Sequence, residues 1–266
     1  MVTKKLKAKG RSRKPVRRKK TRRWKVSPWL VAAALAVLAC LVLLPYWKNG
    51  RFASTGAKIP DDAKAFGLDI SHHNEGIVWD SLMVLVDSRG YTGKDLLRAK
   101  KVIPIDRVIM KATEGERMVD SRFDTYWKEA GSRRYARGAY HFFRSSKDPA
   151  RQAAHYIKHV RLRHSDLPPI LDVETMHAGC TKEELNGKVL IWLQTVEKHY
   201  GRTPIVYASD SFARDILSSE ITGHYPMWIA RYNNKPPRFD SWAMWQFTDK
   251  AVLYGVSGYV DLSVIR

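Results

Sequence analysis

The chain has 266 residues, with 47 Lys and Arg against 26 Asp and Glu, and a formal net charge of +21. Residues 1–27 hold 14 of the basic residues and no acidic one, whereas residues 28–266 hold 33 basic and 26 acidic residues. This distribution argues against a nucleic-acid-binding protein that is basic throughout, and 44% hydrophobic content excludes a wholly disordered chain.

Residues 29–47 follow the basic block and form an uncharged run, WLVAAALAVLACLVLLPYW. A helix of this length measures about 28 Å, close to the ~30 Å hydrocarbon core of a bilayer. Aromatic residues stand at both ends of the run, as they do at membrane interfaces. We predict a single transmembrane helix over 29–47. Because positive charge stays inside, residues 1–28 should lie in the cytoplasm and the rest of the chain outside the bacterial cytoplasmic membrane.

Two other interpretations of this run are disfavoured. A cleaved signal peptide usually has an apolar region of about 7–15 residues, and this run is longer. A lipoprotein attached at Cys40 is disfavoured because the apolar stretch continues past that residue. The basic tail is interpreted as a topogenic segment that also contacts anionic lipid, in preference to nucleic acid, because only Trp24 interleaves its charges.

Residues 48–64 are a predicted polar linker, and strand and helix patterns alternate from residue 65 onward. Eight short apolar runs rich in β-branched and aromatic residues are predicted strands: 66–71, 107–114, 137–144, 168–174, 204–209, 226–232, 242–248 and 259–265. Helices are predicted at 120–134, 149–162, 182–200 and 210–219. Thr181 and Glu184 are a predicted capping box.

This order predicts an α/β fold, an irregular (β/α)8-type barrel over residues 65–266 preceded by the single transmembrane helix. A doubly wound open sheet is the alternative. It is disfavoured because no strand is followed by a Gly-rich phosphate loop.

Active sites of such barrels lie at the carboxyl ends of the strands. Those ends carry a set of polar and aromatic residues: Asp69, Glu114, His141, Asp172, Glu174, Tyr207, Arg231, Gln246 and Asp261. Tyr232, just beyond one strand, is a further candidate for stacking on a sugar ring. His141 lies within an aromatic strand and fits a core position as well as a site position.

Asp172 and Glu174 form the sharpest pair, because a side-chain period of two places them on one side of a strand with backbones about 6.6 Å apart. Repulsion and partial burial should raise the pKa of one carboxyl, as cleavage of a glycosidic bond by a general acid requires. If the barrel closes, Asp69 and Asp261 join them. A metal site is the less favoured use of this cluster, with support from His72, His73 and His141.

The motifs, taken in order, resemble the glycoside hydrolase family 25 lysozymes, or muramidases. They are FGLDISHHN (66–74), VIMKATEG (108–115), GAYHFF (138–143), PILDVE (169–174), PIVYAS (204–209), MWIARY (227–232), MWQFTD (244–249) and GYVDLSV (258–264). The resemblance implies an irregular β/α barrel that hydrolyses the β-1,4 bond between N-acetylmuramic acid and N-acetylglucosamine in peptidoglycan.

The resemblance also implies roles for the acids: Glu174 is the general acid, and Asp172, Asp69 and Asp261 are the other catalytic carboxylates. Tyr207, Tyr232, Gln246, Glu114, His141 and Arg231 are expected to bind substrate, and no cofactor is expected. One departure is Ser263, which stands where the family's last motif usually has Asn. The expected partners are peptidoglycan glycan strands and membrane lipid. The alternative is a membrane-anchored peptidoglycan-binding protein that has lost catalysis, which intact Asp172 and Glu174 disfavour.

Overall fold

The computed structural model describes residues 56–61, 63, 65–133 and 135–266. The predicted tail, the predicted span over 29–47 and the first part of the predicted linker lie outside these residues. Within the described part, no helix is long and apolar enough to cross a bilayer.

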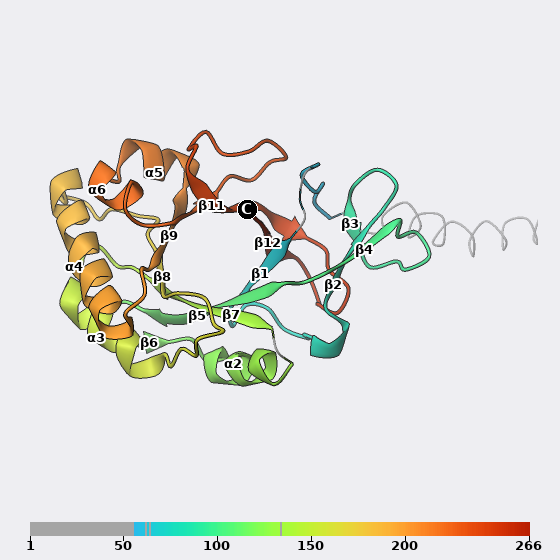
Figure 1. The fold of residues 1–266 in the computed structure, drawn as a ribbon, viewed down its shortest axis with the longest axis horizontal. Coiled ribbons are helices and arrows are strands. Elements are labelled where there is room, and N and C mark those ends of the chain that lie inside the picture. Colours follow the sequence, from blue (N-terminus) through green and yellow to red (C-terminus); the bar gives the residue numbers. More distant parts are fainter. Residues whose placement is uncertain (1–55, 62, 64, 134) are drawn as a thin grey trace, which may run out of the picture. The chain divides into compact units, whose positions relative to one another are not determined.

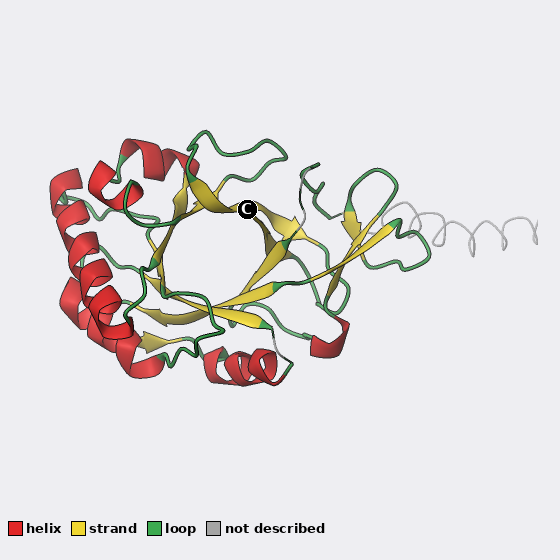
Figure 2. Cartoon of the chain, viewed as in Figure 1, coloured by secondary structure: helices red, strands yellow, loops and turns green. Residues whose placement is uncertain are grey.

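Eight strands form a closed barrel, and they match the eight predicted runs. They are β1 (Phe66–Ile70), β5 (Arg107–Glu114), β7 (Ala136–Phe142), β8 (Ile170–Asp172), β9 (Ile205–Ser209), β10 (Met227–Ala230), β11 (Trp242–Ala251) and β12 (Val260–Ile265). The sheet order is β1-β12-β11-β10-β9-β8-β7-β5, and pairing of β1 with β5 closes the ring, as Figures 1 and 2 show. The predicted barrel is therefore confirmed.

The barrel is irregular because β12 runs antiparallel to both of its neighbours, β1 and β11. The other seven strands are parallel to one another wherever they pair. Only the eight residues 252–259, all described, connect β11 to β12. A parallel crossover needs a dozen or more residues, so this short connection fixes the antiparallel direction of the strand.

Helices cover one side of the barrel (Figure 1). They are α2 (Phe123–Ser132), α3 (Pro149–His159), α4 (Lys182–Tyr200), α5 (Asp210–Asp215) and α6 (Ser219–Thr222). The predicted capping box is present at the start of α4, where the Thr181 side chain accepts from Glu184 N and Glu184 accepts from Thr181 N. Gly201 ends this helix with φ 62°, in the left-handed region that glycine adopts most easily.

The segment between β1 and β5 folds into elements that the sequence did not predict. They are the short 3-10 helix η1 (Trp79–Ser81) and a three-stranded antiparallel sheet of β2 (Met83–Val86), β3 (Thr92–Gly93) and β4 (Lys101–Pro104), in the order β3-β2-β4. This sheet stands beside the barrel on the side away from helices α3 and α4 (Figure 1). A short strand β6 (Met118–Val119) extends the barrel sheet from β5.

Two separate apolar cores follow from the alternation of side chains along the strands. The smaller core fills the barrel interior with Ile109, Ile170, Ile205, Tyr207, Trp228, Ala230 and Met244. The larger core, which includes Tyr156, Trp192 and Val196, packs between the strands and the helices. The apolar interior supports the strands from below, so that polar side chains of the same phase meet at the mouth of the barrel.

Candidate active site

A cavity of about 150 Å³ opens at the carboxyl ends of the parallel strands. Its lining comprises Asp69, Ser71, His73, Lys111, Tyr140, Phe142, Asp172, Glu174, Tyr207, Trp228, Tyr232 and Asp261. A second hollow of about 230 Å³ is lined by Glu174, Tyr207, Ser209, Ala230 and Tyr232. The two hollows share Glu174 and two tyrosines, so they form adjoining parts of one cleft.

The barrel brings all four predicted carboxylates to this cleft. Asp69 on β1 lies directly opposite Asp261 on β12 in the antiparallel register. Asp261 therefore reaches the mouth from the amino-terminal part of its strand, which corrects the expectation that it ends a parallel one. Asp172 is the last residue of β8, and Glu174 lies two residues beyond the end of that strand.

Burial differs among the four acids. Asp172 is 6% exposed, Asp69 and Asp261 are half-buried, and Glu174 is exposed at the rim. One oxygen each of Asp69 and Asp172, both Oδ1, is buried without a hydrogen-bond partner among the described residues. One oxygen of each of these two carboxylates therefore lacks a donor that would stabilise the charged form.

The electrostatics of the cleft raise the pKa of every one of these acids. Burial raises the pKa of Asp172 well above its usual range, and the charges of Glu174 and Asp69 raise it further. Burial and the charge of Asp261 likewise raise the pKa of Asp69. Burial, with the charges of Asp249 and Glu174, raises the pKa of Asp261 to about 6. The cluster can therefore hold protons near neutral pH.

Opposing effects act on the pKa of Glu174. Partial burial raises its pKa, and the positive charges of Lys111 and Arg144 oppose that rise. Its carboxyl group stands at the rim, within reach of both hollows. A group that is exposed to a ligand and has a raised pKa is suited to give and take a proton.

Gln246 links the tyrosines to the acids. Its Nε2 donates to Asp69 Oδ2 (3.3 Å) and to Asp261 Oδ2 (3.4 Å). Its Oε1 accepts from the hydroxyl groups of Tyr207 (2.7 Å) and Tyr232 (3.1 Å). Gln246 is 1% exposed, so it holds its neighbours in place from beneath the cleft.

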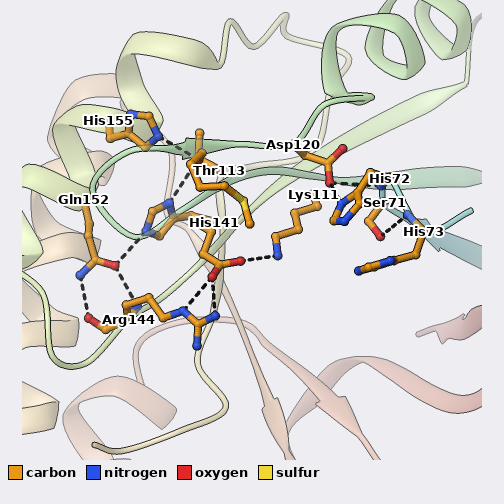
Figure 3. Close-up of polar contacts among 12 residues, drawn as sticks. Ser71, His72, His73, Lys111, Thr113, Asp120, His141, Arg144, Gln152 and His155 are labelled. Atoms are coloured by element: carbon orange, nitrogen blue, oxygen red, sulfur yellow. Dashed lines mark hydrogen bonds and ion pairs between the residues drawn. The ribbon is translucent and has the colours of Figure 1, made fainter.

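Lys111 lies between the cleft and a neighbouring ion-pair cluster (Figure 3). Its Nζ donates to Glu114 Oε2 at 2.6 Å, and Arg144 Nε donates to Glu114 Oε1 at 2.8 Å. Burial alone would raise the pKa of Glu114, but these two cations lower it overall. Glu114 thus pairs with two cations and does not line this cavity, and its contact with substrate stays a prediction.

His141 does not reach the cleft. It is fully buried on the helix-facing side of β7, where Nδ1 lies 2.7 Å from Thr113 Oγ1 and Nε2 lies 3.2 Å from Gln152 Oε1 (Figure 3). Its ring stacks on Trp192, and burial lowers its pKa to about 3. The expectation that His141 binds substrate is corrected, because its neighbours Tyr140 and Phe142 take the inward phase of the strand.

Arg231 also lies outside the two hollows. Its guanidinium Nη1 donates to Pro236 O at 2.6 Å, and its own carbonyl accepts from Trp245 Nε1 at 2.9 Å. Arg231 therefore braces the loop after β10, and the structure does not support the prediction that it contacts substrate.

Six residues that line the cavity were not among the predicted site residues: Ser71, His73, Lys111, Tyr140, Phe142 and Trp228. Strand phase carries the signal for four of them, and Phe142 shares the inward phase of Tyr140. Lys111 alternates with the interior residue Ile109, and its register partner is Tyr140. Trp228 lies opposite Tyr207 in the pairing of β10 with β9. The indole Nε1 of Trp228 donates to Ser263 Oγ at 3.0 Å, which gives the unusual serine a defined role.

Within the described part of the chain, no group of three or more His, Cys, Asp and Glu side chains is arranged to hold a metal ion. Of the histidines proposed for it, His72 is engaged by Asp120, whose Oδ2 lies 2.6 Å from its Nδ1. His141 is buried away from the acids.

Comparisons with known proteins agree with this geometry. The sequence model of glycosyl hydrolases family 25 matches residues 68–256. The uncharacterized protein YegX of Escherichia coli K12 is 32% identical over 215 residues, which are 80% of this chain and 74% of YegX. Lysozyme M1 of Streptomyces globisporus is 26% identical, over 76% of this chain and 67% of its own length. A family 25 glycosyl hydrolase from Bacillus anthracis superposes with a TM-score of 0.65 at 26% identity, covering 80% of this chain and 93% of that structure.

Proposed function

The chain belongs to family 25 of the glycosyl hydrolases and is a glycoside hydrolase, and we propose that it is a lysozyme acting on the β-1,4 bond between N-acetylmuramic acid and N-acetylglucosamine in peptidoglycan. The observation that carries the proposal is the cleft itself. A rim glutamate with a raised pKa stands beside three less exposed aspartates, whose pKa values are also raised. The relative named Lysozyme M1 supports the same substrate class.

Glu174 is proposed as the general acid. It protonates the leaving glycosidic oxygen while the bond from that oxygen to the anomeric carbon breaks. Its exposure at the rim allows contact with a bound glycan strand, and its raised pKa favours the protonated form that a general acid needs.

Asp172 is proposed to orient the substrate's own acetamido group, whose carbonyl oxygen attacks the anomeric carbon as the leaving group departs. The Glu174 carboxylate then takes a proton from water, and that water opens the cyclic intermediate and regenerates the acid. Asp69 and Asp261 are proposed to tune the pKa values of the catalytic pair, since the charge of Asp69 raises the pKa of Asp172, and both share the amide of Gln246.

Two tyrosines are proposed to contact the sugar rings. Tyr207 and Tyr232 line both hollows, and Gln246 accepts a hydrogen bond from each of them. Tyr232 is 54% exposed, so its ring offers an apolar face to a sugar.

The chain is further proposed to be anchored in the bacterial cytoplasmic membrane by residues 29–47. Residues 1–28 then lie in the cytoplasm, in contact with anionic lipid, and the barrel lies on the outer side, where peptidoglycan is found. Carbonate extraction of membranes tests this, because a spanning chain stays in the pellet at its full length. A shorter soluble product would instead show a cleaved signal peptide.

The decisive experiment compares the full chain with its Glu174→Gln variant on purified peptidoglycan. The rate of peptidoglycan hydrolysis, measured by mass spectrometry of the products and by an assay of released reducing ends, should fall about 10²–10⁴-fold in the variant. The reason is that the variant cannot transfer the proton. Glu183→Gln, an exposed change in the first turn of α4, is the matched control and should keep full activity.

Two outcomes would contradict the assignment. Activity of Glu174→Gln close to that of the unaltered chain would remove Glu174 from the mechanism. An unaltered chain that binds peptidoglycan without releasing any reducing ends would favour the alternative, a binding protein that has lost catalysis.

A further inference from the structure

The insert that carries β2, β3 and β4 ends in a tip, residues 94–102, which exposes apolar side chains. Leu97 is 97% exposed, Leu96 52% and Val102 58%. Every residue of this stretch except Ala99 is exposed. Single exposed apolar residues are ordinary, but several in one short segment mark a surface that meets an apolar partner.

The same tip is basic. Residues 83–104 contain five Lys and Arg against two Asp. The two aspartates pair locally, Asp87 with Arg89 and Asp95 with Arg98. Lys94, Lys100 and Lys101 are exposed and form no ion pair among the residues that the structure describes. Leucines flanked by such ammonium groups are typical of surfaces that lie on anionic lipid.

The insert is also hydrogen-bonded to residues 56–59, which precede the first barrel strand. Gly56 N donates to Thr92 O, Thr92 N donates to Ala57 O, and Ile59 N donates to Gly90 O, each at 2.9 Å. Residues 56–59 therefore run along the insert. Residue 56 follows the predicted span by nine residues, which reach at most about 30 Å in any conformation. If that span lies in a bilayer, chain length alone holds residue 56 and its partner Thr92 within this distance of the lipid surface.

We propose that the tip of the insert docks on the anionic phospholipid surface beside the membrane anchor. Leu96 and Leu97 enter the headgroup region, and Lys94, Lys100 and Lys101 face lipid phosphates. The tip contributes no residue to either hollow of the cleft, so docking leaves the candidate active site unoccupied by lipid. The inference rests on the proposed anchor and is independent of the proposed lysozyme activity.

The test places a fluorophore on the tip of the full chain in lipid nanodiscs. In a Cys40→Ser, Cys180→Ser background, Leu97→Cys is labelled, and quenching by doxyl-labelled lipid is measured in anionic phosphatidylglycerol and in zwitterionic phosphatidylcholine. Ile191→Cys is the matched control, because Ile191 is an apolar side chain on helix α4 that is 46% exposed. A third chain adds Lys100→Glu and Lys101→Glu to the labelled tip.

We expect quenching at position 97 to be at least threefold that at position 191 in anionic lipid. It should fall to the level of the control in zwitterionic lipid and in the Lys100→Glu, Lys101→Glu chain. Equal quenching at the two positions, or quenching at 97 that ignores both lipid charge and the lysine changes, would overturn the proposal. Peptidoglycan hydrolysis by the same samples is scored separately, so that loss of docking and loss of lysozyme activity are distinguishable.

Discussion

In the layer between the barrel and its helices, Arg137 and Asp166 are buried as a two-pronged ion pair, with side chains 5% and 2% exposed. Arg137 Nε and Nη2 donate to the two oxygens of Asp166 at 2.8 and 2.7 Å, and Nη1 donates to Trp127 O. At the mouth of the barrel, Asp172 is almost as buried, at 6%, yet its Oδ1 has no partner among the described residues.

The difference follows from the alternation of side chains between the two faces of strand β7. Arg137 and His141 occupy the outward phase of β7, where helices supply partners, whereas Tyr140 takes the inward phase and faces the acids. The outward side chains of Arg137 and His141 are hydrogen-bonded and stabilise the fold. The inward acidic groups lie close to other negative charges, and this repulsion destabilises the folded protein. The repulsion can be relieved when a substrate binds.

Arg137→Met, which removes the cation of the buried ion pair, should have the largest effect on stability. The variant leaves Asp166 buried without its cation, and we expect the free energy of unfolding to fall by about 3–5 kcal/mol, as measured by urea denaturation. Arg133→Met is the matched control, because the partners of Arg133 are exposed and its loss should leave the free energy of unfolding almost unchanged. Equal losses in the two variants would show that burial of the Arg137 pair does not matter.

Asp172→Asn, a change among the carboxylates at the mouth of the barrel, should lower activity and raise stability. Hydrolysis of peptidoglycan should fall about a hundredfold or more, because the charge that orients the substrate is gone. The free energy of unfolding at pH 7 should rise by about 1 kcal/mol, because like-charge repulsion is relieved. Asp166→Asn, the same chemical change in the helix layer, should lower stability and leave the kcat of the folded enzyme unchanged. Destabilisation by Asp172→Asn would contradict the idea that repulsion among the carboxylates at the barrel mouth destabilises the fold.

The two regions should also differ in their response to pH. Asp261, with its pKa raised to about 6, retains its proton in the folded state longer than in the unfolded state, so its contribution to stability is lost as pH rises from about 4 to about 6. His141, with its pKa lowered to about 3, contributes stability that is present above about pH 6.5 and lost as pH falls toward 3.

Asp261→Asn isolates the first of these effects. Its unfolding free energy should match that of the unaltered chain near pH 4 and exceed it by about 1–2 kcal/mol at pH 7. Denaturant unfolding at four pH values between 4 and 7 measures the difference. A gain that is constant over this range would mean that the titration of Asp261 is not its cause.

Ser263→Ala should have the smallest effect. It leaves the buried indole N–H of Trp228 without its acceptor, which should lower the free energy of unfolding by about 1 kcal/mol. Thermal unfolding measures this loss, and Ser263→Asn should recover part of it because an amide oxygen can also accept. A Ser263→Ala chain as stable as the original would show that water replaces the serine.

The sequence was sufficient to predict the barrel because each barrel strand carries its own apolar run and the motifs follow one another in order. It could not predict the insert. Strand β3 has two residues, and β4 is exposed at three of its four positions, so neither shows alternation. Their structure depends on pairing with β2, which no local pattern reveals.

The candidate site was predicted where strand phase was known and missed where it was not. Asp172 was placed correctly because Ile170 fixed its phase, whereas His141 was included because it is polar and near a strand end. Glu114 and Arg231 satisfy the same criterion, yet Glu114 pairs with Lys111 and Arg144, Arg231 donates to Pro236 O, and neither side chain lines the two hollows. Polarity at a strand end therefore selects candidates, and inward phase decides among them.

The antiparallel strand β12 has a consequence for the order in which the enzyme is made. A ribosome completes β12 after all the other strands of the barrel, and this strand alone supplies Asp261 and closes the ring against β1. Gln246, which also touches Asp69 across 177 positions of sequence, arrives only shortly before it. A partly synthesised chain thus has no assembled cleft, and the ability to cut a polymer that a cell depends on appears only once the barrel is whole.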